Sequence, residues 1–314
     1  MENPPGSRSG WAIVFLIAAL YAAAYAWTLA TFRGETSMQP QVFGETVSSP
    51  DYVVLRVDVM EIDPIVQEIN LRIIPAAHGN LLAADGVSLA QDIVLDLQDA
   101  RASFGSRLAE GHSEIVFPAG RVLSPLDVTV MLEGGSVDRY PFDRYTVDFV
   151  AVVSRRDPAS ASGFQGVPVV VKAGLAVAGF ALDCREAETT DPGRDRATAS
   201  SYDTVALALE VKRSATAFWF SIFLMIIVAA LSLACASVAV SVAVLRRKVE
   251  PQFFTWMAGT LFAIVGLRSV LPGNPPLGAL PDFLVFIWAE SIVALSLLCI
   301  VVVYLRRRGS TAAA

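Results

Sequence analysis

The chain has 314 residues, of which 54% are hydrophobic and only 17% charged, and its formal charge at pH 7 is −6. Soluble globular proteins carry charges on about a quarter of their residues, so this composition excludes an ordinary soluble protein and assigns the apolar excess to lipid. The negative charge gives no electrostatic footprint for nucleic acid. We therefore expect a multi-pass protein of the cell membrane, in contact with the lipid bilayer and without a nucleic-acid partner.

The first predicted element is the uncharged run 11–32, which follows a tail of residues 1–10. At about 1.5 Å per residue, a helix of this length crosses a hydrocarbon core of about 30 Å. Small residues at 22–26 could also form a signal-peptidase site. The length of the run, with Arg8 as the single upstream positive charge, favours an uncleaved anchor. Cleavage remains the alternative and would leave three spans.

The second predicted element is a β-rich domain over residues 33–213, which carries 26 acidic and 16 basic residues. Apolar residues alternate there with the period of two that is typical of strands. The alternating runs are 52–59, 69–73, 93–97, 126–132, 146–153, 167–172, 175–182 and 204–212. Eight or nine short strands without a strong helical stretch predict an antiparallel all-β sandwich of immunoglobulin-like type. Cys184 is its single cysteine, so the domain must depend on its core rather than on a disulfide.

The β domain shows no catalytic or metal-binding motif. His78 and His112 have no HExxH or CxxC spacing, and Asp92, Asp96 and Asp99 lack the alternating oxygen ligands of a calcium loop. We therefore expect a protein that is not an enzyme and has no cofactor, metal site or catalytic residue.

Three further spans are predicted at 214–245, 251–271 and 283–305, separated by short loops at 246–250 and 272–282. Basic residues close the second span at 246–248 and the fourth at 306–308, before the tail that ends at residue 314. Because Lys and Arg beside spans stay on the cytoplasmic side, both termini should be cytoplasmic. The β domain and the loop 272–282 are then extracytoplasmic, and the helices form a bundle of four spans.

Two charges inside these apolar blocks are candidate site residues. Arg268 lies near the outer end of the third span, and Glu290 lies seven residues into the fourth. Both spans meet at the loop 272–282, so we expect an Arg268–Glu290 ion pair that locks the two helices. A transport or proton-handling role is the alternative.

The most distinctive external motif is Tyr140-Pro141-Phe142-Asp143-Arg144-Tyr145, which lies between two predicted strands. With the order of a short tail, one span, a β-rich domain and three spans that end in Arg306-Arg307-Arg308, the chain resembles an actinobacterial membrane-protein family, domain of unknown function 4436. This resemblance covers nearly the whole chain and implies the topology but no established activity.

The same motif, from Tyr140 to Asp143, more distantly resembles the F-P-F-D turn of pentameric ligand-gated (Cys-loop type) channels. The run from Val205 to Arg213 leads into the next span as the last strand of those channels leads into their first membrane helix. The resemblance implies that Asp143 and Arg213 meet within salt-bridge distance where the β domain joins the membrane. The chain departs from those channels in its N-terminal extra span and in the bulky segment 253–262, which lacks a sustained polar stripe.

These observations favour a non-enzymatic envelope protein whose extracytoplasmic β-sandwich binds a ligand or partner. An oligomeric, channel-like or transport protein is the second hypothesis, in which the partner is another copy of the chain. An envelope enzyme is the third, and it requires a cleft with convergent titratable groups.

Overall fold

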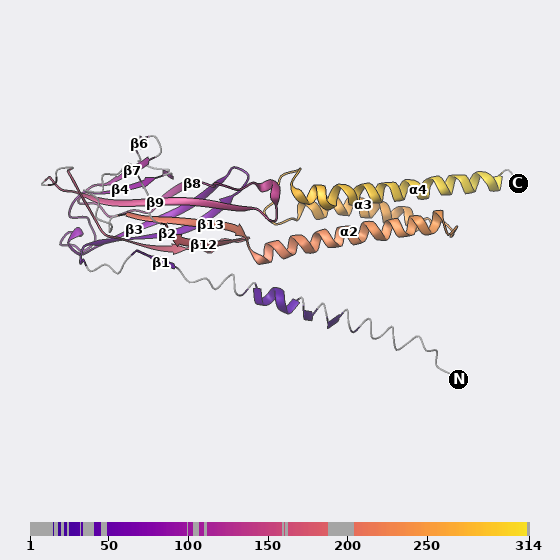
Figure 1. Ribbon diagram of the computed structural model, residues 1–314, viewed down its shortest axis with the longest axis horizontal. Coiled ribbons are helices and arrows are strands. Elements are labelled where there is room, and N and C mark those ends of the chain that lie inside the picture. The colour runs from indigo at the N-terminus through magenta and orange to yellow at the C-terminus, as the bar shows by residue number, and fades with distance from the viewer. Residues whose placement is uncertain are drawn as a thin grey trace.

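The computed structural model consists of a β domain at one end and a bundle of long helices at the other (Figure 1). It describes residues 41–44, 49–98, 100–102, 107–109, 112–158, 160, 163–187 and 204–312, together with residues 15, 18–19, 22–23, 25–31 and 33. The predicted tail 1–10 lies outside the described residues, as does much of the predicted first span at 11–32. The described residues of that segment are helical.

The first sheet of the β domain has six strands in the order β1-β11-β2-β3-β8-β5. Their bounds are β1 Gln41–Phe43, β2 Tyr52–Asp63, β3 Glu68–His78, β5 Ala100–Ala102, β8 Leu126–Met131 and β11 Val169–Gly174. Strands β11 and β2 pair in parallel, whereas the other pairs of this sheet are antiparallel. The expectation of a purely antiparallel sandwich was therefore wrong at this pair, because alternation of side chains does not specify strand direction.

The second sheet follows the order β12-β13-β9-β4-β7-β6, with β10 paired to β9. Its strands are β4 Ile93–Gln98, β6 Arg107–Ala109, β7 His112–Phe117, β9 Arg144–Arg156, β10 Phe164–Gly166, β12 Phe180–Glu186 and β13 Thr204–Arg213. Short 3₁₀ turns occur at Gly79–Leu81 (η1) and Val137–Arg139 (η2). The run 175–182 was predicted as a strand, but only its end is one, because Val177 and Phe180 close a turn around Gly179, whose φ is +82°.

The core of the β domain lies between the two sheets. Every second residue is buried in β3, in β2 up to its bulge after Val59, and in β9 from Tyr145 to Ala151. Leu55, Ile73 and Phe149 are almost completely inaccessible to solvent. Burial of a Leu, Ile or Phe side chain contributes about 1.5–3 kcal/mol. The alternation of apolar residues in the sequence therefore corresponds to one apolar layer, which holds the two sheets together.

Three helices follow the β domain: α2 Ala215–Ala243, α3 Gln252–Ser269 and α4 Ile287–Ala312, with a π-helical turn η3 at Asp282–Phe286 before α4. Ser214 caps α2, since its Oγ accepts a hydrogen bond from Ala217 N. The helices pack through apolar residues that include Val228, Cys235, Met257, Val293 and Ile300. At their far end, Arg307 donates hydrogen bonds to the carbonyl oxygens of Val242 and Arg247.

Within the described residues, two helices are long and apolar enough to cross a membrane. They are Ala215–Ala243, with 29 residues, and Asp282–Arg308, with 27. Helix α3 has 18 residues and carries Arg268 in its last turn. The fold is thus a two-sheet β domain joined to a helical bundle with two candidate spans.

Candidate functional site: the joint between the β domain and the helices

The turn between β8 and β9 extends from the β domain toward the helices (Figure 1). It contains η2, which Ser136 caps through a hydrogen bond from Asp138 N, and then the segment Tyr140–Asp143 before β9 begins. The Tyr140–Pro141 peptide bond is cis, and Phe142 N donates to Arg139 O at 2.8 Å. The turn is therefore compact and hydrogen-bonded, with Tyr140 and Asp143 buried and Phe142 exposed.

Asp143 forms a buried ion pair with Arg213, the last residue of β13. Nε of Arg213 lies 3.1 Å from Oδ1 and 3.0 Å from Oδ2 of Asp143, and Nη2 lies 2.9 Å from Oδ2. The side chain of Arg213 is 2% exposed and that of Asp143 is 0% exposed. The predicted contact within salt-bridge distance is confirmed, and its role in coupling stays a prediction.

Aromatic residues surround this ion pair. The guanidinium carbon of Arg213 lies 4.9 Å from the ring centre of Tyr140 and 4.5 Å from that of Phe180, distances at which a cation is attracted to the ring face. Tyr145 donates a hydrogen bond of 3.1 Å to Oδ2 of Asp143. Burial, and then the neighbouring Asp143 charge, raise the pKa of Tyr145. The phenol therefore stays protonated and acts as a donor.

Tyr140 connects the turn to the helices. Its ring is completely buried and belongs to the apolar core of the bundle, which also includes Leu224, Met225 and Phe286. Its hydroxyl forms a hydrogen bond with Oγ of Ser221, which in turn donates to Ala217 O at 2.7 Å. Phe142 adds an edge-to-face contact with Phe218, with ring centres 5.4 Å apart. The β8–β9 turn is thus packed into α2 by polar and apolar contacts.

Arg268 organises the loop between α3 and α4, but its partner is Asp282 rather than Glu290. Its Nε and Nη2 each lie 3.0 Å from an Asp282 oxygen, and it donates 2.9 Å bonds to the carbonyl oxygens of Pro275 and Pro276. The predicted Arg268–Glu290 pair was therefore wrong. Glu290 lies eight residues beyond Asp282, about 12 Å along a helix, so Asp282 is the carboxylate at the level of the loop. Glu290 is half-buried on α4.

The same loop also reaches the Asp143–Arg213 pair. A Cβ atom placed on Gly273 would collide with Nη1 of Arg213, and Gly273 has a φ of +74°, which favours glycine. The loop backbone therefore passes directly beside the guanidinium. We define the joint as Tyr140, Asp143, Arg213, Ser221 and Gly273, which come from the β8–β9 turn, the end of β13, α2 and the α3–α4 loop.

Two family models match the chain. Residues 43–206 match a domain of unknown function, DUF4436, and residues 213–307 match another, DUF8686. The chain belongs to the DUF4436 family. No curated protein matches this DUF4436 member. Asp143 lies in the DUF4436 region and Arg213 is the first residue of the DUF8686 region, so the ion pair of the joint links the two matched regions.

Two of the other candidate residues of this DUF4436 member, His78 and Asp92, have local structural partners. His78 stacks on Tyr52, with ring centres 4.5 Å apart, and Asp92 pairs with Arg156 and accepts from Ala119 N. Asp99 lies outside the described residues. Across the part of the chain that the structure describes, no group of three or more His, Cys, Asp and Glu residues could hold a metal ion.

Sequence reasoning missed Ser221, Gly273 and Asp282. Asp282 follows Pro281 at the start of a helical segment, where an acidic residue complements the helix dipole. This position at a helix start could have identified Asp282 as a partner for Arg268. Asp282 was instead assigned to the loop, because it precedes the uncharged run that begins at residue 283. Ser221 and Gly273 carry no such signal, since their role depends on residues that are distant in the chain.

Proposed function

We propose that this protein is a non-enzymatic, multi-pass protein of the cell membrane, whose β-sandwich lies outside the cytoplasm, binds a ligand or a protein partner, and transmits that event to the spans through the joint. The observation that carries the proposal is the buried Asp143–Arg213 pair, which the α3–α4 loop covers at Gly273. A flexible tether between two independent parts would not require matched, desolvated charges at their contact.

The proposed topology has four spans and a cytoplasmic location for both termini. Helices α2 and α4 have the length and apolarity of spans, and an α3 of 18 residues extends about 27 Å. The contact of Arg307 with the backbone at Val242 and Arg247 supports a common side for the two basic clusters. By the positive-inside rule that side is cytoplasmic, so the β domain faces outward.

The joint connects the β domain to two different parts of the bundle. Tyr140 and Arg213 connect the β domain to α2. Tyr140 forms a hydrogen bond with Ser221 of α2, and Arg213 directly precedes Ser214, the capping residue of α2. Gly273 leads to the α3–α4 loop, which the Arg268–Asp282 contact holds in shape. A displacement of the β8–β9 turn would therefore move α2 and the loop together.

The proposal is tested by hydrogen exchange on the full chain in lipid nanodiscs. We expect Asp143→Asn, a change in the β domain, to increase amide exchange several-fold at residues 270–281, because the loop loses an ordered surface. The matched control is Asp127→Asn, which breaks the exposed pair with Arg72 and should leave exchange in the loop unchanged. Unchanged exchange in Asp143→Asn would show that the joint transmits nothing to the loop.

The second candidate function is an oligomeric, channel-like assembly, and the exposed face of α3 favours it. Around the exposed ring of Phe262, this face presents Gln252, Thr255, Gly259, Gly266 and Ser269. Small and weakly polar residues let membrane helices approach closely. The oligomeric mass in mild detergent tests this candidate, since a channel requires several copies and a monomer would remove it.

A further inference from the structure

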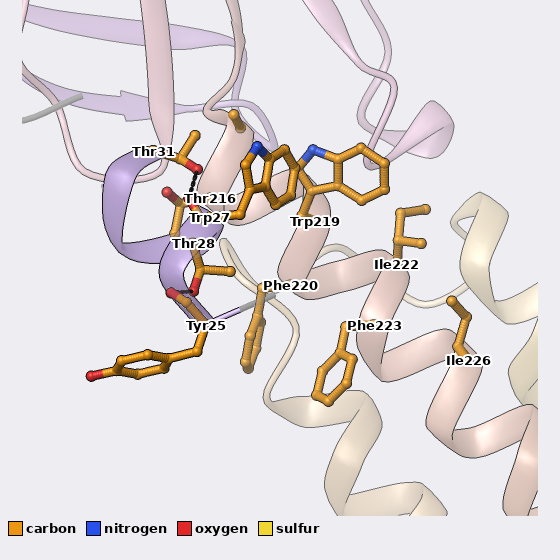
Figure 2. A pocket seen from close by; sticks show the side chains of 11 residues that line it. Tyr25, Trp27, Thr28, Thr31, Thr216, Trp219, Phe220, Ile222, Phe223 and Ile226 are labelled. Atoms are coloured by element: carbon orange, nitrogen blue, oxygen red, sulfur yellow. Dashed lines mark hydrogen bonds between the residues drawn. The ribbon is translucent and has the colours of Figure 1, made fainter. Parts of the chain in front are cut away.

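A groove separates the helical segment 25–31 from the first three turns of α2 (Figure 2). Its volume is about 500 Å³, within the range of small-molecule sites. Most of the side chains that line it are aromatic or aliphatic, and Figure 2 shows Phe220 and Phe223 extending from α2 below the paired rings of Trp27 and Trp219. The groove belongs to the helical part of the protein and is separate from the joint.

The threonines of the segment 25–31 do not make the groove polar. Oγ1 of Thr28 donates to Tyr25 O at 2.8 Å, and Oγ1 of Thr31 donates to Trp27 O at 2.6 Å. Because each hydroxyl is bonded to its own helix (Figure 2), these side chains do not need a ligand as hydrogen-bond partner. Since eight of the eleven lining residues are also aromatic or aliphatic, the groove selects for hydrocarbon rather than for a polar molecule.

The groove has one end suited to lipid headgroups. Trp27 and Trp219 meet edge to face, with ring centres 5.2 Å apart, at the end of α2 next to the β domain. Tryptophan is enriched at the boundary between lipid and water. Two exposed cations lie close to this end along the chain, since Arg33 follows Thr31 by two residues and Lys212 precedes Ala215 by three.

The other end of the groove continues along the surface of α2. Ile226 is 61% exposed, and Leu233 and Val240 extend the same exposed apolar surface along the helix. An occupant therefore needs a hydrocarbon portion that enters from the lipid-facing surface and an anionic group near Arg33 and Lys212. A membrane phospholipid has both, whereas a second copy of the acidic β domain offers no acyl chain.

We propose that the groove binds one acyl chain of an outer-leaflet phospholipid whose anionic headgroup lies beside Arg33 and Lys212. This assignment rests on the proposed placement of α2 in the membrane. It makes the contact between the first span and α2 direct at the Trp27–Trp219 pair and lipid-filled along the rest of the groove. The bound lipid then supports the helix that begins directly after Arg213 of the joint.

Native mass spectrometry of the full chain, released from mild detergent, tests this site with phosphatidylglycerol as the probe. The wild type should retain one lipid at collision energies that strip all others. Ala215→Trp, which fills the groove, should lose that lipid. The matched control Ala263→Trp places the same ring at an exposed position of α3, away from the groove, and should keep it. Equal retention by Ala215→Trp and Ala263→Trp overturns the proposal.

A second pair of variants tests the same site if Ala215→Trp does not fold. Phe223→Ala removes a ring from the groove and should weaken retention several-fold, whereas Phe262→Ala removes an exposed ring from α3 and should not. Phosphatidylcholine with the same acyl chains should be retained several-fold less well, and equal retention would overturn the headgroup assignment. If the wild type does not fractionate with membranes, the proposed function itself fails; if it does but these variants behave alike, the lipid site alone fails.

Discussion

The Asp143–Arg213 pair places two opposite charges where neither has access to bulk water. Removal of such charges from water costs several kcal/mol per ion, and the attraction of the pair compensates only if the geometry is good and the remaining oxygen positions are bonded. Here the carboxylate accepts bonds from Arg213 and Tyr145, and the guanidinium contacts two aromatic rings. The pair therefore specifies how the turn and the strand end fit together.

Asp143→Asn should destabilise the protein by about 3–5 kcal/mol, because it leaves a buried guanidinium without its counter-charge. The double variant Asp143→Asn, Arg213→Gln should recover part of the loss, since no uncompensated charge remains. Denaturant unfolding in detergent micelles measures both. Asp127→Asn, at the exposed pair with Arg72, serves as the control and should not shift the unfolding midpoint. A double variant that is as unstable as the two single losses combined would contradict a paired interaction.

Cys184 should be chemically inert in the folded protein. Burial, and secondarily the charge of Asp183, raise its pKa to about 12, so only about one thiol in 10⁴ is ionised at pH 8. Alkylation by iodoacetamide at pH 8 should therefore require unfolding. Because the folded pKa is raised above its ordinary value of 9.0, the thiol also favours unfolding as pH rises from about 9 to 12. Cys184→Ala should remove that part of the alkaline destabilisation; rapid alkylation of the native wild type would contradict the burial.

At the scale of elements, the loop between α3 and α4 is held at three points. Arg268 bonds both oxygens of Asp282 and two proline carbonyls, Gly278 N donates to Asp282, and Gly273 lies against Arg213. The loop is thus shaped by its own helices and fitted to the β domain at a single glycine. Gly273 and Gly278 both have positive φ, but only Gly273 lies against Arg213. A comparison of these two positions therefore distinguishes the shape of the loop from its fit to the β domain.

Gly273→Ala should destabilise the protein more than Gly278→Ala. Both residues have positive φ, +74° and +91°, so both variants incur the strain of a left-handed conformation. Only the new methyl group at position 273 collides with Arg213, whereas position 278 has open space. Overpacking costs a further 1–3 kcal/mol or so. Thermal unfolding of the two variants in the same detergent compares them, and equal destabilisation would mean that the loop does not press on the joint.

The sequence predicts the long elements better than the short ones. Burial on one face imposes the alternation that located β2, β3, β9 and β13, whereas the three-residue strands β1, β5, β6 and β10 are too short to establish a period. The Asp143–Arg213 contact was predictable only through a resembling motif, since 70 residues separate the two positions. Arg268 was assigned the wrong carboxylate because an apolar-run boundary excluded Asp282, although the structure begins the helical segment there.

At the scale of the whole molecule, the β domain and the far ends of the helices lie at opposite ends (Figure 1). If α2 and α4 cross a bilayer, these ends face different compartments. The acidic β domain and the basic clusters at 246–248 and 306–308 then give the molecule a strong charge asymmetry. Such an asymmetry determines orientation, because basic residues next to spans resist translocation.

Labelling of intact cells with a membrane-impermeant maleimide tests this orientation. A cysteine at Gly163, where an added side chain meets open space, should react, whereas one at Gly309, beyond the basic cluster, should react only after the cells are permeabilised. The natural cysteines provide a low background, since Cys184 and Cys235 are buried and Cys299 is half-buried in α4. The Gly163→Cys and Gly309→Cys variants control for each other, because each adds one thiol to the same chain. The two thiols differ in the side of the membrane on which they are expected to lie. Reaction of Gly309→Cys in intact cells would show that the C-terminal end lies outside the cytoplasm. It would contradict the proposed orientation and the proposal that the β domain binds its partner outside the cytoplasm.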